Sequence, residues 1–548
     1  MFKGLFKTLP LLMLAPVTCA VLAEDSNQYL IESTNALLPL SWEELNEMDV
    51  STLARTEQTV KDTPAAAFVI TAEDIRRSGA NSLPDVLRMV PGMDVAQVNS
   101  WSAAVSARGF SDLYANKLQV MIDGRSIYDP LVSGVFWEQH NPFLQDIERI
   151  EVLRGPSGSL WGANAVNGTI NIVTRSAKQT QGGLLSVGGG SKEHGFGGLR
   201  YGAQISDSTF VRGTVNGLQR GGSLDLQGAN TTQDYGNAQT VNLRMDSKLS
   251  GKDDLMLQAN FSRFDINGYY IGVTSPDLRS WQASGYGRDG VSGTVQGSWS
   301  RQIEGGEALQ LNMSATQTEW SLAMNQMRRT SVLMDFQHSL PVFGSHHALW
   351  GVNYQAIADQ FENSVTLSFL PERFTQHNVG VFLQDQIDLA SSLKLTLGNR
   401  IEHFTYTGWE TEPNARLLWS PNKQHRLWAA VSRAVVLPNR AQHSIHLYKQ
   451  IPGSSDFVSA TANPDTQTEN LVAYELGWRW QMANNLDLDT AMFYNIYDRM
   501  QGTQIIDSDL MNGIYYAKVG NYRQVTSYGL ETVVNYRFSH DWRLQASA

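Results

Sequence analysis

The sequence predicts a mainly β protein, in which a large antiparallel transmembrane β-barrel follows a smaller α/β domain. Three observations lead to this fold class: an export signal at the N-terminus, a long C-terminal region of alternating apolar and polar residues, and many glycine and aromatic residues. The 548 residues are too many for one ordinary globular core, so we expect more than one domain.

The export signal is predicted at residues 1–23. A basic start precedes an apolar run from Leu9 to Leu22, which is shorter than the about 20 residues that a membrane-spanning helix needs. An uncleaved N-terminal membrane anchor is the alternative. A cut before Glu24 would also remove Cys19, so the exported protein would hold neither a disulfide nor a zinc–thiolate site.

The barrel is predicted at residues 180–548, where apolar residues recur at every second position. Leu393, Leu395 and Leu397, for example, alternate with polar or small residues. Strands with one face in lipid and the other toward a wet lumen produce this pattern. The 46 Gly suit tight turns, and the 14 Trp and 19 Tyr suit aromatic girdles at the two membrane interfaces. A soluble β-sandwich alternates too, but one of this length would have to split into domains.

The alternation continues to the last residues, where Trp542, Leu544 and Ala546 share one face. A barrel has to close, because lipid tolerates no unpaired strand edge. Bacterial single-chain barrels also have an even number of strands. We therefore expect that the last few strands are missing from this sequence.

A compact α/β domain is predicted at residues 61–178. A strand at residues 68–70 leads into a helix that Thr71 caps, with Asp74 in the capping-box position. Gly79 is expected to end this helix, because glycine readily takes the left-handed conformation of a C-cap.

Six segments of this domain, in the family's order, resemble the plug domain of TonB-dependent outer-membrane receptors. Five later segments resemble strands and loops of the same family's barrel. The plug segments are 65–76 (AAAFVITAEDIR), 83–93 (LPDVLRMVPGM), 106–110 (SARGF), 120–124 (VMIDG), 147–156 (IERIEVLRGP) and 162–172 (GANAVNGTINI). The barrel segments are 413–417 (PNARL), 432–434 (SRA), 463–465 (NPD), 474–477 (YELG) and 528–531 (YGLE).

The resemblance implies a 22-stranded barrel with the plug in its lumen, and a receptor that imports a scarce ligand. It implies a periplasmic extension at residues 24–60, a plug at 61–178 and a barrel at 180–548. The resemblance further implies that the protein is a monomer in the outer membrane of a Gram-negative bacterium, surrounded by outer-membrane lipid. The implied energy source is TonB in the periplasm, driven by the inner-membrane proton-motive force.

The resemblance also implies a TonB box, an extended peptide that adds as a strand to TonB. An ordinary linker is the alternative at this place. The candidate residues are Asp49, Val50, Ser51, Thr52, Leu53 and Ala54.

A plug–barrel lock is the second implied site. In the family two plug arginines meet two barrel glutamates, which correspond here to Arg108 and Arg154 and to Glu475 and Glu531. Buried charges have to be paired, and the arginine fork fits a carboxylate. The alternative is that each arginine is an ordinary structural residue at a turn.

The cargo implied by the resemblance is a ferric siderophore, with cobalamin, a saccharide or haem as alternatives. His443 and His446 are candidate haem ligands, because they lie where haem receptors of this family carry an iron-ligating histidine and neutral imidazole binds haem iron. A passive diffusion porin is the alternative from another class, and the plug segments argue against it.

No enzymatic role, resident cofactor or protein-bound metal is expected. The sequence offers no credible catalytic triad, metal cluster or placeable carboxylate pair. The net charge of -11 argues against a nucleic-acid partner.

Overall fold

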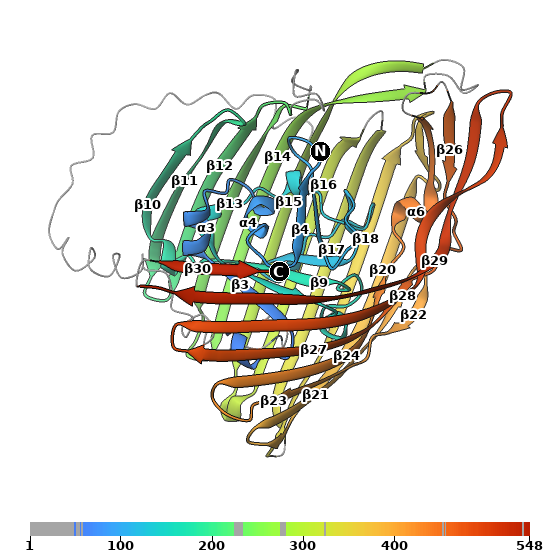
Figure 1. Ribbon diagram of the computed structural model, residues 1–548. Coiled ribbons are helices and arrows are strands. Elements are labelled where there is room, and N and C mark those ends of the chain that lie inside the picture. Colours follow the sequence, from blue (N-terminus) through green and yellow to red (C-terminus); the bar gives the residue numbers. More distant parts are fainter. Residues whose placement is uncertain are drawn as a thin grey trace, which may run out of the picture. The chain divides into compact units, whose positions relative to one another are not determined.

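The protein consists of a long antiparallel sheet and a small α/β domain, the plug, in a computed structural model (Figure 1). The structure describes residues 49–50, 55, 58–223, 234–273, 281–322, 325–342, 344–451, 454, 456–539 and 542–548. The predicted export signal at residues 1–23 lies outside the described residues. No helix in the described part of the chain is long and apolar enough to cross a membrane.

The large sheet runs in sequence order from β10 to β30, with one parallel pair between β26 and β29. Successive hairpins explain most of this order, because short turns join strands that pair antiparallel. The exceptions surround the longer loops, where β18 pairs with β20, β19 with β25 and β24 with β27. The strands are β10 (Gly182–Gly188), β11 (Glu193–Ser206), β12 (Thr209–Arg220), β13 (Gly236–Lys248), β14 (Asp253–Val273), β15 (Trp281–Gln302), β16 (Ala308–Leu322), β17 (Asn325–Val342), β18 (His346–Glu362), β19 (Leu367–Phe369), β20 (Arg373–Ala390), β21 (Leu393–Phe404), β22 (Gly408–Thr411), β23 (Asn414–Trp419), β24 (His425–Val436), β25 (Ile445–Gln450), β26 (Phe457–Thr461), β27 (Glu469–Ala483), β28 (Leu486–Asp509), β29 (Ile514–Arg537) and β30 (Arg543–Ser547).

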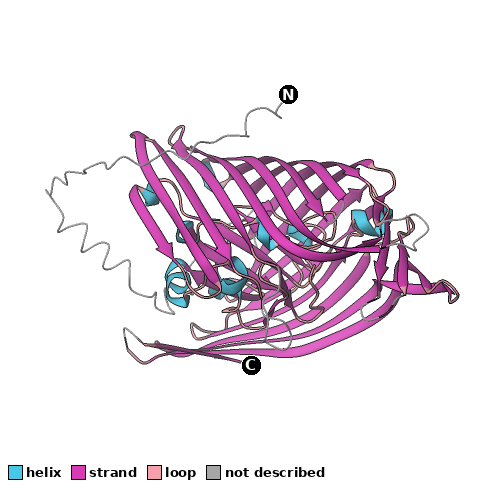
Figure 2. Cartoon of the chain, turned by 90° about the horizontal axis from the view of Figure 1, so that it is seen from above, coloured by secondary structure: helices cyan, strands magenta, loops and turns pink. Residues whose placement is uncertain are grey.

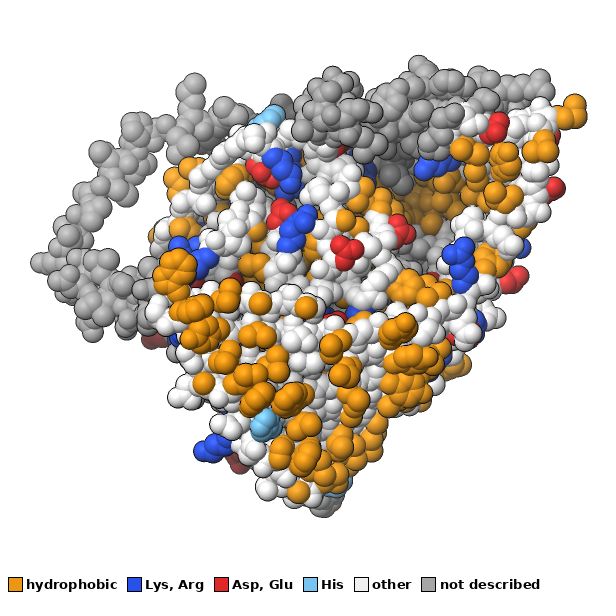
Figure 3. Space-filling model, in the orientation of Figure 1, with side chains coloured by type: hydrophobic (Ala, Val, Ile, Leu, Met, Phe, Trp, Pro, Cys, Tyr) orange, Lys and Arg blue, Asp and Glu red, His pale blue; other side chains and the backbone are white. Residues whose placement is uncertain are grey.

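The two faces of this sheet differ as the alternation predicts. On β20, Val381 and Leu383 are 53% and 58% exposed, whereas Phe382 between them is fully buried. Apolar side chains also gather on the outer face over β24, β27 and β28 (Figure 3). The strand content, the alternation and the enclosed α/β domain confirm the predicted fold class.

The plug lies inside the curve of the large sheet, where the strands surround it in the view from above (Figure 2). Its central sheet has the order β3-β8-β9-β6-β7, and β4 pairs with β5. Ile70, Val86, Leu87, Ile147 and Ile170 belong to its apolar core. The elements are β3 (Ala66–Thr71), β4 (Met93–Gln97), β5 (Ala103–Ala107), β6 (Leu118–Ile122), β7 (Arg125–Ser126), β8 (Ile147–Arg154) and β9 (Gly168–Thr174), with helices α3 (Ala72–Ser78), α4 (Leu83–Leu87) and α5 (Gly158–Trp161) and the 3-10 turns η1 (Val60–Asp62), η2 (Trp137–Gln139), η3 (Leu144–Asp146) and η4 (Lys178–Thr180).

Helix α3 begins and ends where the sequence predicts. The Thr71 hydroxyl accepts a hydrogen bond from the Asp74 amide at 3.1 Å, and the Asp74 carboxylate accepts one from the Thr71 amide at 3.0 Å. Gly79 has a φ of 68°, which is the left-handed conformation of a C-cap. The capping box and the C-cap prediction are therefore confirmed.

Candidate functional site

The four predicted lock residues meet at the contact between the plug and the large sheet. Arg108 follows β5 and donates from Nη1 to Glu475 Oε1 at 2.7 Å and from Nε to Glu531 Oε1 at 3.1 Å. Arg154, at the end of β8, places Nη1 2.9 Å from Glu531 Oε2. Glu475 lies on β27 and Glu531 on β29, so two plug arginines share two carboxylates of the sheet.

Close packing surrounds these ion pairs. The Arg108 guanidinium lies over the Phe493 ring, 4.5 Å from its centre. Gly155 has a φ of +109°, and a Cβ there would lie 2.3 Å from Glu475 Oε1. A side chain at this position would push Glu475 away, so the glycine serves close approach as well as the tight turn.

A second anchor lies at the start of the described chain and was not predicted. Arg55 is 8% exposed and donates from Nη1 to Asp335 on β17 at 2.7 Å. Its guanidinium lies 4.3 Å from the Trp161 ring centre and 4.6 Å from that of Phe382. Gln337 donates to the Arg55 carbonyl at 3.0 Å.

Arg55 belongs to the predicted periplasmic extension, residues 24–60, and packs between the plug and the large sheet. The reason is that its charge is paired with Asp335 and its flat faces are covered by aromatic rings, so burial is tolerated.

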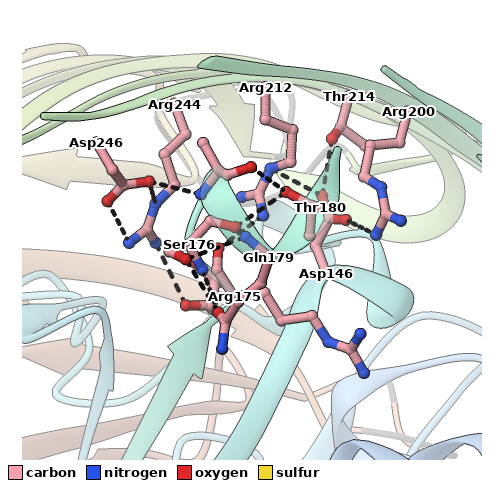
Figure 4. A network of polar contacts seen from close by, with 12 residues as sticks. Asp146, Arg175, Ser176, Gln179, Thr180, Arg200, Arg212, Thr214, Arg244 and Asp246 are labelled. Atoms are coloured by element: carbon pink, nitrogen blue, oxygen red, sulfur yellow. Dashed lines mark hydrogen bonds and ion pairs between the residues drawn. The ribbon is translucent and has the colours of Figure 1, made fainter. Parts of the chain in front are cut away.

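The third anchor holds the C-terminal end of the plug to β11, β12 and β13 (Figure 4). Asp146 pairs with Arg200 at 3.0 Å and accepts from the Thr214 hydroxyl at 2.7 Å. Arg212 donates to the Arg175 carbonyl at 2.8 Å. The segment that joins plug and sheet is thus bound to the wall that it enters.

This anchor includes a second ion pair. Arg244 on β13 pairs with Asp246 at 2.8 Å and donates to the Thr174 hydroxyl at 2.7 Å. The Asp246 carboxylate also accepts from the Ala177 amide at 2.6 Å. Two barrel side chains therefore bind the end of β9 and the backbone of the segment that follows it.

The plug apex contacts the long segment between β24 and β27. The amide of Arg440, the first residue of α6 (Arg440–Ser444), donates to the Pro130 carbonyl at 2.9 Å, and the Ala441 amide donates to Leu131 at 3.1 Å. The structure thus places a short helix of this segment directly on the plug.

The two candidate haem ligands lie on this same segment. His443 on α6 is 8% exposed and stacks on Tyr406 with ring centres 4.0 Å apart. Burial lowers the pKa of His443 to about 4 and also lowers the pKa of His446 on β25. Both imidazoles are therefore biased to the neutral form, and a role in haem binding stays a prediction.

The candidate TonB box is described only in part. Asp49 and Val50 form β1 (Asp49–Val50), which pairs antiparallel with β2 (Gln58–Thr59). Residues 51–54 lie outside the described residues.

A cavity of about 330 Å³ lies between the plug and β14–β21. Arg55, Trp161 and Arg400 line it together with several asparagine and glutamine side chains. Within the described ranges, His, Cys, Asp and Glu form no group of three or more that could hold a metal ion.

Known protein families match both the plug and the large sheet of this chain. The TonB-dependent receptor plug domain matches residues 59–169, and the TonB-dependent receptor-like β-barrel matches residues 186–548. The iron-regulated outer membrane virulence protein of Vibrio cholerae is 25% identical over 472 residues, which cover 82% of this chain and 68% of that protein. The vitamin B12 transporter BtuB of Vibrio vulnificus is 26% identical over 479 residues, covering 83% and 71%.

Two solved structures share the fold. The siderophore receptor PirA from Pseudomonas aeruginosa gives a TM-score of 0.69 at 17% identity, covering 88% of this chain and 86% of that chain. A mutant of the ferric enterobactin receptor PfeA from the same organism gives 0.72 at 16% identity, covering 91% and 81%. The predicted resemblance is thereby confirmed.

Proposed function

Because the chain belongs to the TonB-dependent receptor family, we propose that it actively imports a scarce ligand across the outer membrane of a Gram-negative bacterium. The observation that carries this proposal is a plug held in place by buried ion pairs, above all those of Arg108 and Arg154. A passive porin needs an open lumen, whereas a plug bound in this way moves only when work is done on it.

TonB is the proposed source of that work. The candidate box, residues 49–54, immediately precedes Arg55, so a pull that separates β1 from β2 next loads the Arg55–Asp335 pair. Backbone groups of an extended box would add as a strand to TonB. The extended pairing of β1 with β2 is compatible with such a strand.

The outer face supports a place in the membrane. Exposed apolar side chains such as Leu476, Met492 and Leu530 are 59%, 52% and 56% exposed. Water would disfavour so many apolar side chains on one face, whereas lipid accommodates them. A monomer surrounded by outer-membrane lipid fits this surface.

A ferric siderophore is the proposed cargo, and cobalamin is the second candidate. The Vibrio cholerae relative is named for its regulation by iron, and the Vibrio vulnificus relative is named a vitamin B12 transporter. The solved structures named for siderophores support the fold at identities too low to carry the cargo.

The test is growth of a host that lacks its own receptors for these ligands and expresses this chain. Iron-limited cells receive a ferric trihydroxamate, a ferric tris-catecholate or haem, and cobalamin-requiring cells receive cobalamin. The variants are Leu53→Pro, which removes a backbone donor from the box, and its matched control Leu53→Ala, which keeps it.

We expect growth on one iron chelate with the natural chain and with Leu53→Ala, and none with Leu53→Pro at equal receptor levels. Growth with cobalamin alone would show that the cargo is cobalamin, the second candidate, and not a siderophore. Equal growth with both variants would contradict energy coupling through this box, and no growth on any ligand would overturn the import proposal for these cargoes.

A further inference from the structure

One wall of the cavity between the plug and β14–β21 consists of neutral amide side chains. On β16, β18 and β20 these side chains occupy alternate positions and point away from the outer face. On β18, for example, Val352 and Tyr354 alternate with the amides and are 37% and 40% exposed on the outer face. We call this set the amide passage. It consists of Gln310, Asn312, Asn353, Gln355, Gln376 and Asn378.

The amides of the passage are neighbours across the sheet. Asn312 on β16 and Asn353 on β18 both lie opposite Asp335 of β17. Gln355 lies opposite Asn378 of β20, whose amide donates to it at 3.1 Å. The amides on β18 and β20 are therefore direct neighbours, whereas those on β16 and β18 flank Asp335.

Several polar atoms on this surface have no hydrogen-bond partner within the described part of the chain. They include Asn353 Oδ1 and Gln376 Nε2 on the wall and Asn171 Oδ1 on the plug side. Gln376 and Asn171 are only 6% and 5% exposed. Buried polar groups normally find partners, so these atoms point to a ligand or water that supplies them.

Charged side chains along the cavity are paired with one another. Toward the TonB box, Arg55 pairs with Asp335 at 2.7 Å and Arg400 with Glu402 at 2.7 Å. Asp123 and Arg149, on the plug side, pair with Arg244 at 3.8 Å and Glu151 at 2.8 Å. Each described charge on the lining therefore has an ion-pair partner, although Arg55 Nε and Arg400 Nε have no hydrogen-bond partner within the described part of the chain.

Ion pairs also lie beyond the far end of the passage. Arg329 lies opposite Asp359, one inward position beyond Ile357, which lines the cavity. Arg329 binds Asp129 at 2.7 Å, and Asp359 binds Arg440 at 3.0 Å. Paired charges therefore lie within the amide wall, where Asp335 binds Arg55, and also beyond its far end.

We propose that the amide passage is an inner binding site for a neutral, hydrogen-bonding part of the cargo, with hydroxyl, amide or hydroxamate groups. Amide side chains offer both donors and acceptors to such groups. An anionic group would lose its hydration there and meet only cations that already have a carboxylate partner, which is costly. This inference rests on the proposed function and narrows its cargo: a ferric trihydroxamate is neutral, whereas a ferric tris-catecholate carries a charge of about −3 at neutral pH.

Single cysteines placed in the passage test this charge preference without any cargo. The variants are Gln376→Cys and Gln355→Cys, and the control is Gln504→Cys on the exposed part of β28. Intact cells receive either neutral 2-hydroxyethyl methanethiosulfonate or anionic 2-sulfonatoethyl methanethiosulfonate, which are similar in size. The ratio of neutral to anionic labelling rates at Gln504→Cys corrects for the intrinsic reactivity of the two reagents.

We expect this ratio to be at least about tenfold higher at Gln376→Cys or Gln355→Cys than at the control. Adding Asn378→Lys opposite Gln355→Cys should remove the preference by supplying a cation. Equal ratios at passage and control, no labelling of either inner cysteine in the folded receptor, or an unchanged preference after Asn378→Lys would overturn the proposal.

An uptake measurement separates this inference from the proposed function. Reaction of Gln376→Cys with the neutral reagent should reduce uptake of a neutral ferric trihydroxamate at least about tenfold and leave Gln504→Cys unaffected. Unchanged uptake after complete labelling would overturn the inner site. If the natural chain takes up no ligand while the labelling preference holds, the proposed function fails and only the preference of the passage for neutral molecules stands.

Discussion

The two glutamates of the plug–barrel lock contribute unequally to the free energy that holds the plug, and two matched variants can measure the difference. Glu531→Gln leaves Arg154 without an ion pair among the described residues, so we expect the about 3–5 kcal/mol cost of breaking a buried pair. Glu475→Gln leaves Arg108 bound to Glu531. Its expected cost is therefore nearer the about 1.5–3 kcal/mol of one hydrogen bond to a charged group.

Hydrogen exchange of the purified receptor, followed by mass spectrometry, measures this difference in the plug itself. The amides of β8, which ends at Arg154, report the free energy of local opening of the plug. We expect this free energy to fall more in Glu531→Gln than in Glu475→Gln, with exchange of β20 unchanged. Glu319→Gln is the control, because Glu319 forms a partly exposed pair with Arg328 that contributes at most about 1 kcal/mol.

Two outcomes would refute the reasoning. An equal or larger effect of Glu475→Gln would show that Arg154 does not depend on Glu531. Unchanged protection of β8 in Glu531→Gln would show that apolar packing of the plug, and not the shared ion pairs, fixes it in the lumen.

Three further perturbations address the other two anchors and helix α6. Asp335→Asn should free Arg55 and raise the rate at which maleimide labels Ser51→Cys without cargo, because the box loses its anchor; an unchanged rate would contradict this. Asp146→Asn should speed hydrogen exchange around η4 and leave β8 protected, and equal loss at both places would argue against a separate C-terminal anchor. The lowered pKa of His443 means that the unfolded segment binds more protons between pH 6.5 and about 4, so α6 should lose protection as the pH falls through this range. His443→Phe should remove that dependence, and a pH dependence that persists would assign it elsewhere.

Much of the fold follows from the sequence because it rests on short-range rules. The period-two alternation predicts strands such as β20 with one apolar and one lumen-facing side, and the structure has this arrangement. Thr71, Asp74 and Gly79 predict both ends of α3 because capping is decided within a few residues. The order of the strands in the sheet follows from their sequence, since each hairpin joins neighbours.

The site is predictable only where a resemblance links distant residues. Arg108 and Glu475 are 367 residues apart, and no local pattern relates them. The family resemblance paired these positions, but it gave no signal for Arg55 and Asp335, which lie 280 residues apart. The amide passage could not be predicted from the sequence either. Asn353 and Gln376 are ordinary lumen-facing polar residues by their pattern, and only the strand register places them on one cavity.

The order of the anchors along the chain determines which side of the plug a pull from the box would loosen. The Arg55–Asp335 pair comes first, and Asp335 belongs to the same wall as the amide passage. Arg175 and Ala177, which bind Arg212 and Asp246, come last, just before the covalent link into β10. If the proposed box is pulled, we expect the force to act first at the wall that carries the passage, because Arg55 and Asp335 both line that cavity, while the contacts with β11–β13 lie on other strands.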